Sequence, residues 1–324
     1  MDDEGGRRRT SGETRRRYLK WGRIGVTIAA VGYLASRVDP GDVVAAFRML
    51  SWSAALFAVS VVMFGLFCGM VRWRFLLRAY GAIDIPSWPR IAHLYFVGHF
   101  YNTYAPGGVG GDVIRGVAGR KAFGELDLAS ATSGVAVVFI ERVVGVSALL
   151  VLAAGAYLIR PIPGMEGVGL WAGLGLAAAA ASLIGIAVAP RLAPHLPERL
   201  AKPLRALPRL YSIGPFLVAV FLSLVIHSVN IIAGHAIMHS LEPSVTFAQS
   251  AVLMPLIGAS AFFPLTVGGA GVREAAFAAL YGTVGVPEAT AYAGSLSFWA
   301  TQLISAAIGG IINLFVPLSG NPRD

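Results

Sequence analysis

Long runs of hydrophobic residues alternate with short basic stretches along most of the chain. Two apolar segments, 91–104 and 247–263, are too short to cross a membrane comfortably, and each leads into a glycine-rich motif. The other runs reach the roughly 20 residues that cross a bilayer as a helix. They cover approximately residues 19–38, 52–71, 128–159, 168–189, 213–238 and 289–316. The pattern predicts an all-α polytopic membrane protein with about six full transmembrane helices and two re-entrant half-helix elements.

The composition supports the same class. Hydrophobic residues make up 56% of the 324 positions and charged residues 13%, whereas soluble proteins carry roughly 25% charged residues. A soluble chain this apolar would have too few polar residues to cover its surface. We therefore expect a disordered basic tail over residues 1–17, a transmembrane domain over 18–318 and a short cytoplasmic tail over 319–324.

The basic residues indicate how the helices are oriented. They concentrate in the N-terminal tail and in residues 72–90 and 190–211, and an excess of Arg and Lys marks cytoplasmic loops. This distribution predicts a cell-membrane (inner, cytoplasmic membrane) protein with both termini in the cytoplasm. Because these residues flank apolar runs, the net charge of +9 predicts contact with anionic lipid headgroups and argues against nucleic-acid binding.

A short motif occurs twice. Residues 106–115 read PGGVGGDVIR and residues 264–273 read PLTVGGAGVR, so that Pro, Val, two Gly and Arg coincide without a gap. Each copy follows a short apolar segment, and we expect a longer helix after each. Three predicted membrane crossings separate the two copies of the motif, so the copies enter the membrane from opposite sides. This is the inverted-repeat plan of secondary transporters, in which the substrate lies near the midplane. A chance likeness of two glycine-rich turns is the alternative.

The repeated motif predicts an anion site. A helix broken at membrane depth must lie inside protein or beside a watery cavity, and the amides of a restarting helix favour anions. Arg115 and Arg273 add positive charge there, while Glu141 and Arg142 lie deep in an apolar run and need partners. We expect Glu141 to pair with Arg115 or Arg273. The predicted substrate-binding residues are Asn102, Gly110, Gly111, Asp112, Arg115, Glu141, Arg142, Gly268, Gly269, Arg273 and Glu274.

Two alternatives concern these polar residues. We expect Arg142 to pair with Asp112, Glu274 or a ligand phosphate, and the alternative is that the membrane charges form structural ion pairs that lock helices together. His227, Asn230 and His235 share one face of a predicted helix, where they line a polar cavity or join neighbouring helices, and we favour helix packing.

The sequence carries no motif for cofactor chemistry. It has no phosphate-binding Gly-x-x-x-x-Gly-Lys-Ser/Thr loop, no zinc-ligand spacing and no Gly-x-Ser-x-Gly nucleophile elbow. The single cysteine, Cys68, cannot form an internal disulfide. We therefore expect no catalytic residues, metal or cofactor, and a transporter rather than an enzyme.

Four elements in order resemble a known family. Phe100–Asn102, residues 106–115, Glu141-Arg142 and residues 264–274 together resemble the lysylphosphatidylglycerol synthase transmembrane-region (flippase domain) family over residues 18–318. The resemblance implies a helical bundle with two re-entrant elements and translocation of lipid between leaflets. Its best-known members move aminoacylated phosphatidylglycerol. This chain ends at Asp324 without a soluble aminoacyl-transfer domain, so we expect a stand-alone member that does not synthesise the lysyl lipid and whose lipid headgroup is open.

Three functions follow from the residues and the resemblance. The first is a lipid translocase that moves an anionic phospholipid or a polyprenyl or glycolipid headgroup, with its phosphate bound at a midplane cationic site. The second is a membrane enzyme or accessory factor for a lipid-linked sugar, with Glu141, Glu274 or Asp112 as general acid or base. The third is a small-anion carrier. The expected partners are membrane lipids with anionic headgroups, and a homo-oligomer stays an open alternative.

Overall fold

Helices make up the regular structure of the described residues. The computed structural model describes residues 41, 44–45, 48–104, 108–124, 128–163, 165, 168–205, 207–260 and 271–316. Five helices in these ranges are long and apolar enough to cross a membrane. They are α3 (Trp52–Ala79), α6 (Leu128–Ile159), α7 (Val168–Leu192), α9 (Ile213–Leu241) and α12 (Glu288–Phe315). They confirm five of the predicted spans, while the span 19–38 and both predicted tails lie outside the described residues.

Helix α3 is longer than the sequence pattern predicted. It begins after Ser51, whose hydroxyl accepts a hydrogen bond from the Ala54 amide, and it ends just before Gly81, which has a φ of +84°. We expected the span to end near residue 71 and Arg72 to lie in a cytoplasmic loop. That expectation is wrong for Arg72, which is buried inside the helix. Its charge is tolerated there because a carboxylate of another helix pairs with it.

Short helices surround both copies of the repeated motif. Helices α4 (Trp88–Tyr104) and α10 (Phe247–Ser260) precede the motifs, and α5 (Gly110–Gly119) and α11 (Val272–Gly282) follow them. We expected longer helices at the second position, but α5 and α11 have only 10 and 11 residues. Soon after each of them the backbone turns at a glycine with positive φ, Gly124 and Gly285, a conformation that glycine adopts without strain.

The chain thus contains two series of four helices with the same order of lengths. One series is α3 to α6 and the other is α9 to α12, each with two short helices between two long ones. Helices α3 and α9 run antiparallel, because the Ser51 amide bonds to the Ser240 hydroxyl (2.9 Å) while the Tyr211 amide bonds to the Ala79 carbonyl (2.9 Å). The first short helix of each series packs against the last long helix of the other series: α4 packs on α12 and α10 packs on α6.

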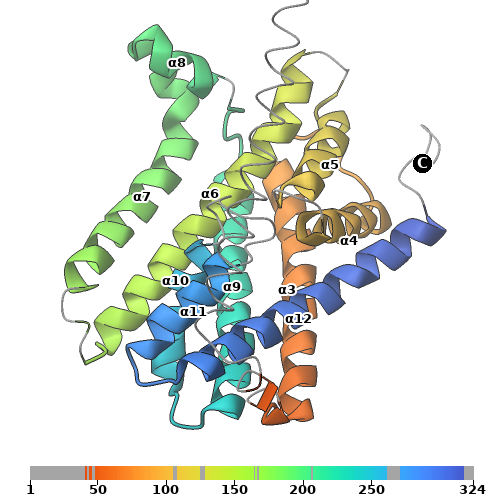
Figure 1. Cartoon of the computed structure of the whole chain (residues 1–324). Helices are drawn as coiled ribbons and strands as arrows, with labels where there is room; N and C mark the ends of the chain where they lie inside the picture. The colour runs from red at the N-terminus through yellow and green to blue at the C-terminus, as the bar shows by residue number, and fades with distance from the viewer. Residues whose placement is uncertain are drawn as a thin grey trace, which may run out of the picture.

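The remaining elements lie at the edge of the bundle. Helix α7 packs along α6 and stands at the left of Figure 1. It leads through the 3-10 turn η2 (Ala193–His195) to α8 (Glu198–Arg205), and a second such turn, η1 (Arg120–Phe123), follows α5.

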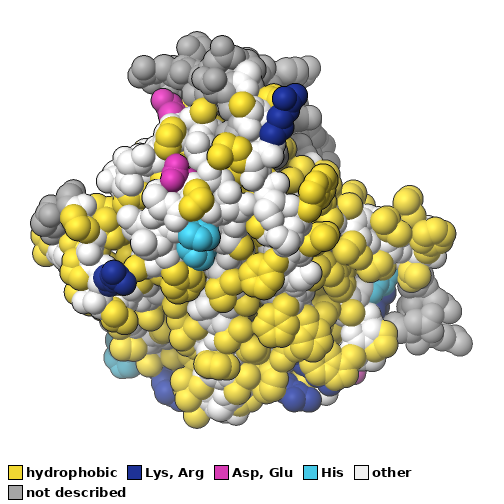
Figure 2. Space-filling model, turned by 90° about the horizontal axis from the view of Figure 1, so that it is seen from below, with side chains coloured by type: hydrophobic (Ala, Val, Ile, Leu, Met, Phe, Trp, Pro, Cys, Tyr) yellow, Lys and Arg dark blue, Asp and Glu magenta, His cyan; other side chains and the backbone are white. Residues whose placement is uncertain are grey.

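The outer surface is rich in large apolar side chains. Figure 2 looks at one end of the molecule, where hydrophobic side chains cover much of the face and charged ones are few. On the long helices, Phe64, Phe139, Trp171 and Phe221 are each more than half exposed. Apolar surface of this extent on long apolar helices is the surface that a bilayer covers.

A tight contact between α4 and α5 gives a first prediction. A Cβ at Gly111 would lie 1.7 Å from the carbonyl oxygen of Gly98, so Gly111→Ala has to push two backbones apart. We expect a loss of at least about 2 kcal/mol of unfolding free energy. Gly185→Ala is the matched control, since a Cβ there meets nothing within 4 Å. Thermal unfolding in detergent measures both variants, and equal melting temperatures would contradict the packing of α4 on α5.

Candidate functional site

A buried carboxylate at the middle of α6 organises the first cluster of charges. Glu141 is 2% exposed and accepts hydrogen bonds from two arginines on different helices. Arg72 of α3 lies 2.6 Å from one carboxylate oxygen, and Arg115 of α5 lies 2.6 Å from the other. Tyr95 of α4 also contacts Glu141, with 3.4 Å between the hydroxyl and carboxylate oxygens. Glu141 therefore joins α3, α4 and α5 to α6.

Asp112 extends this cluster toward the break between α4 and α5. It bonds to Arg115 at 2.8 Å and to the Nε of Arg142. Arg142 also donates to the Gly108 carbonyl oxygen at 3.0 Å, so its guanidinium joins α6 to the backbone of the break. The expected pairs of Glu141 with Arg115 and of Arg142 with Asp112 are both present.

The N-terminus of α5 is capped by a side chain. The Asn102 carbonyl oxygen accepts hydrogen bonds from the amides of Gly111 (2.8 Å) and Asp112 (3.2 Å), while its amide nitrogen donates to Asp112 (2.9 Å). Gly110 is the first residue of the helix. We predicted that amides at this terminus bind an anion. In the structure, two of them are bonded to Asn102, and an anion would have to displace that side chain.

The second motif forms a smaller cluster. Arg273 and Glu274 of α11 pair with each other at 2.5 Å, and both contact the Ser295 hydroxyl of α12. Glu274 also accepts a hydrogen bond from the Gly271 amide at 2.6 Å. The Arg273 guanidinium lies 4.9 Å from the centre of the Trp299 ring, a distance at which cation and ring attract. Gly268 and Gly269 lie outside the described residues.

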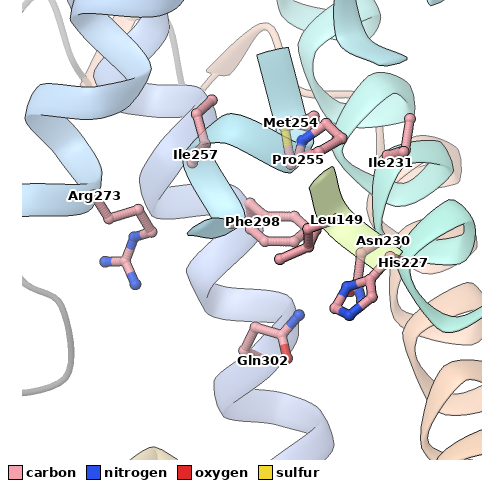
Figure 3. Close-up of a pocket in the computed structure, with 11 residues that line it drawn as sticks. Leu149, His227, Asn230, Ile231, Met254, Pro255, Ile257, Arg273, Phe298 and Gln302 are labelled. Atoms are coloured by element: carbon pink, nitrogen blue, oxygen red, sulfur yellow. The ribbon is translucent and has the colours of Figure 1, made fainter. Parts of the chain in front are cut away.

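A cavity of about 220 Å³ lies beside this second cluster. Figure 3 shows Arg273 at the left, His227 and Asn230 at the right, and Gln302 below and between them. The walls come from α6, α9, α10, α11 and α12. The lining residues are Leu149, His227, Asn230, Ile231, Met254, Pro255, Ile257, Gly258, Arg273, Phe298 and Gln302.

One cavity residue links the two clusters. The Nε2 atom of His227 is buried and has no hydrogen-bond partner in the described part of the chain. A Cβ at Gly145 would lie 3.4 Å from that atom and 4.0 Å from Arg72. Because Gly145 has no side chain, α6 passes close to both residues. His227 therefore lies between the ion cluster around Glu141 and the cavity beside Arg273.

Several of these residues were missed or misjudged in the sequence. Arg72 was assigned to a loop, and Gln302 was not considered. For His227 and Asn230 we favoured helix packing, but both line the cavity. His235, on the face predicted to include them, does pack between helices, with Nδ1 3.1 Å from the Ser250 hydroxyl. No three His, Cys, Asp or Glu side chains gather as metal ligands within the described ranges.

The fold and its buried charges define the class: this is a multi-pass α-helical membrane protein. Residues 20–310 match the family described as the lysylphosphatidylglycerol synthase TM region. Because this match covers nearly the whole chain, the chain belongs to that family. A comparison with curated proteins found no match.

Proposed function

We propose that this protein moves lipids with an anionic headgroup between the two leaflets of a membrane, and that the cavity beside Arg273 receives the headgroup. One observation carries the proposal: the cavity combines an arginine and neutral polar groups with an otherwise apolar wall. An amphiphile needs both surfaces at once, because its phosphate requires a cation and its glycerol ester and chain carbons require apolar contact.

The arrangement of the helices supports a transporter. We infer that α3 to α6 and α9 to α12 form an inverted repeat, since the corresponding helices α3 and α9 run antiparallel and the short helices exchange partners between the series. We also infer that α4–α5 and α10–α11 are re-entrant elements, each a pair of short helices joined at a glycine-rich motif. Broken helices at a repeat interface are where secondary transporters bind their substrates.

The positions of the basic residues support an orientation with both termini in the cytoplasm. The segments after α3, after α5 and before α9 meet at one end of the bundle, where the Ile83 amide bonds to the Ala122 carbonyl (2.8 Å) and the Tyr211 amide to Ala79. Arg74 and Arg78 near the end of α3, Arg120 and Lys121 of η1, and Arg209 before α9 lie at this end, and an excess of basic residues marks the cytoplasmic side. The opposite end includes Ser51 and Ser240.

Cysteine labelling tests this orientation. In a Cys68→Ser background, Arg209→Cys places a thiol in an exposed segment at the basic end, and Ser244→Cys places one in the loop at the other end. We expect a membrane-impermeant maleimide added to intact cells to modify only the cysteine at position 244. Labelling at position 209 and protection at 244 would reverse the orientation.

A transport assay tests the function. The purified protein is reconstituted into liposomes that contain phosphatidylglycerol with a fluorophore on its acyl chain, and dithionite reduces the fluorophore in the outer leaflet only. We expect protein-containing vesicles to lose nearly all of the fluorescence, and protein-free vesicles about half. Efflux of trapped inorganic phosphate is measured in the same vesicles. Phosphate efflux without lipid movement would favour a small-anion carrier and refute the translocase.

A further inference from the structure

The cavity and the ion cluster occupy matching places in the two helix series. Arg115 and Arg273 end the two copies of the motif, and each lies in the first turns of its short helix. In the first series, the last long helix supplies Glu141 to this arginine. In the second series, α12 supplies Phe298 and Gln302 to the cavity instead. The second series therefore has the cation, but its long helix brings no carboxylate to the cavity.

No carboxylate of the described residues lines the cavity, and the nearby ones are already paired. Glu141 bonds to Arg72 and Arg115, and Glu274 bonds to Arg273 and the Gly271 amide. A ligand ammonium group entering the cavity would face the Arg273 guanidinium, and the neighbouring Glu274 carboxylate is already bound by Arg273, the Gly271 amide and the Ser295 hydroxyl. Charges without a partner at membrane depth are strongly disfavoured.

The remaining polar groups of the cavity are uncharged hydrogen-bonding groups. Gln302 is partly exposed, and its side chain makes no hydrogen bond with the described residues. Asn230 uses its amide nitrogen to bond the Ile226 carbonyl (3.0 Å), which leaves its carbonyl oxygen as an acceptor. With the buried Nε2 of His227, these groups supply both donors and acceptors. Hydroxyl groups satisfy such a set because each hydroxyl both donates and accepts.

We infer that the cavity selects headgroups made of one phosphate and an uncharged, hydroxyl-bearing group, and that it rejects headgroups with an ammonium group. The phosphate pairs with Nη1 of Arg273, because Nε and Nη2 already bond Glu274 and Ser295. The hydroxyls bond to Gln302, Asn230 and His227. This inference rests on the proposed function and names the chemical class of its substrate. The inferred headgroup also differs from that of the cationic lysyl lipid for which the family is named.

Two phospholipids of similar headgroup size test the selection. Acyl-labelled phosphatidylglycerol carries two hydroxyls, and acyl-labelled phosphatidylethanolamine carries an ammonium on the same phosphate. We expect the wild-type protein to move phosphatidylglycerol at least about tenfold faster, because only the ammonium lacks a counter-charge. Gln302→Glu places a carboxylate of α12 at the cavity and should bring the ratio of the two rates to one or below. Gln249→Glu, the same substitution at the start of α10, should leave the ratio unchanged.

Binding is measured alongside transport, as the rise in melting temperature when each lipid is added in detergent. Phosphatidylglycerol should stabilise the wild-type protein more than phosphatidylethanolamine, and Gln302→Glu should reverse that order. Equal rates and equal stabilisation in the wild type would overturn the selection and leave the translocase standing. Movement of neither lipid would overturn the proposed function, while the binding order would still decide the selection. An unchanged order in folded Gln302→Glu protein would show that the cavity is not the headgroup site.

Discussion

Glu141→Gln is expected to destabilise the folded protein by about 3–5 kcal/mol, the usual cost of removing one partner from a buried ion pair. The Glu141 side chain is 3% exposed and pairs with two arginines that are also buried. Without it, Arg72 has no anionic partner in the described structure, and Arg115 retains only Asp112. The expected observations are poor yield and a sharply lower melting temperature in detergent.

Two further variants separate charge from packing. Glu288→Gln makes the same change at the exposed start of α12 and is expected to melt within a few degrees of the wild type. In the double variant Arg72→Gln/Glu141→Gln the unpaired Arg72 charge is gone, so part of the lost stability should return. A Glu141→Gln protein as stable as the wild type would show that the cluster does not hold the helices together.

Arg273→Gln is expected to slow lipid movement roughly ten- to a hundredfold, because a charge-assisted hydrogen bond contributes about 1.5–3 kcal/mol. Among the described residues, Arg273 is the one charged residue that lines the cavity, and its loss removes the group that would hold the phosphate. Arg273→Lys keeps the positive charge and is expected to retain more transport than Arg273→Gln. Arg209→Gln, in an exposed segment before α9, should transport like the wild type.

Stability has to be controlled in this experiment, because Glu274 loses its partner in Arg273→Gln. The variant Arg273→Gln/Glu274→Gln removes both charges together, while the carboxamide introduced at position 274 can still accept a hydrogen bond from the Gly271 amide through its oxygen and donate one to the Ser295 hydroxyl through its nitrogen. We expect this protein to melt near the wild-type temperature and to transport as poorly as Arg273→Gln. Wild-type transport by the folded double variant would refute a role for Arg273 in binding the headgroup.

The lengths of the apolar runs predicted most of the fold, because a helix that crosses hydrocarbon needs about 20 apolar residues. Residues 128–159 match α6 at both ends. The pattern of apolar runs gave a wrong helix end where a charged residue is buried inside a helix. Arg72 was read as the edge of a loop, since a single sequence does not show that Glu141 of a distant helix lies beside it.

The site was predictable where charges lie inside an apolar run. Glu141 and Arg142 had to find partners, and the motif residues Arg115 and Asp112 are those partners. The cavity was harder to predict, because Gln302 and His227 are neutral residues on apolar helices. Whether such side chains face a neighbouring helix or a cavity depends on how the helices pack. Helix α6 brings Glu141 to Arg115, whereas α12 brings no carboxylate to the cavity. This difference between the two series can be seen only in the three-dimensional structure.

The central claim is that a lipid headgroup enters the cavity between α9, α11 and α12. An electron cryo-microscopy reconstruction of the protein in phosphatidylglycerol nanodiscs tests it most directly. We expect density for a phosphate within hydrogen-bonding distance of Arg273, with the glycerol group beside Gln302 and His227. Headgroup density at the start of α5, displacing Asn102 from the Gly111 amide while the cavity stays empty, would contradict the account.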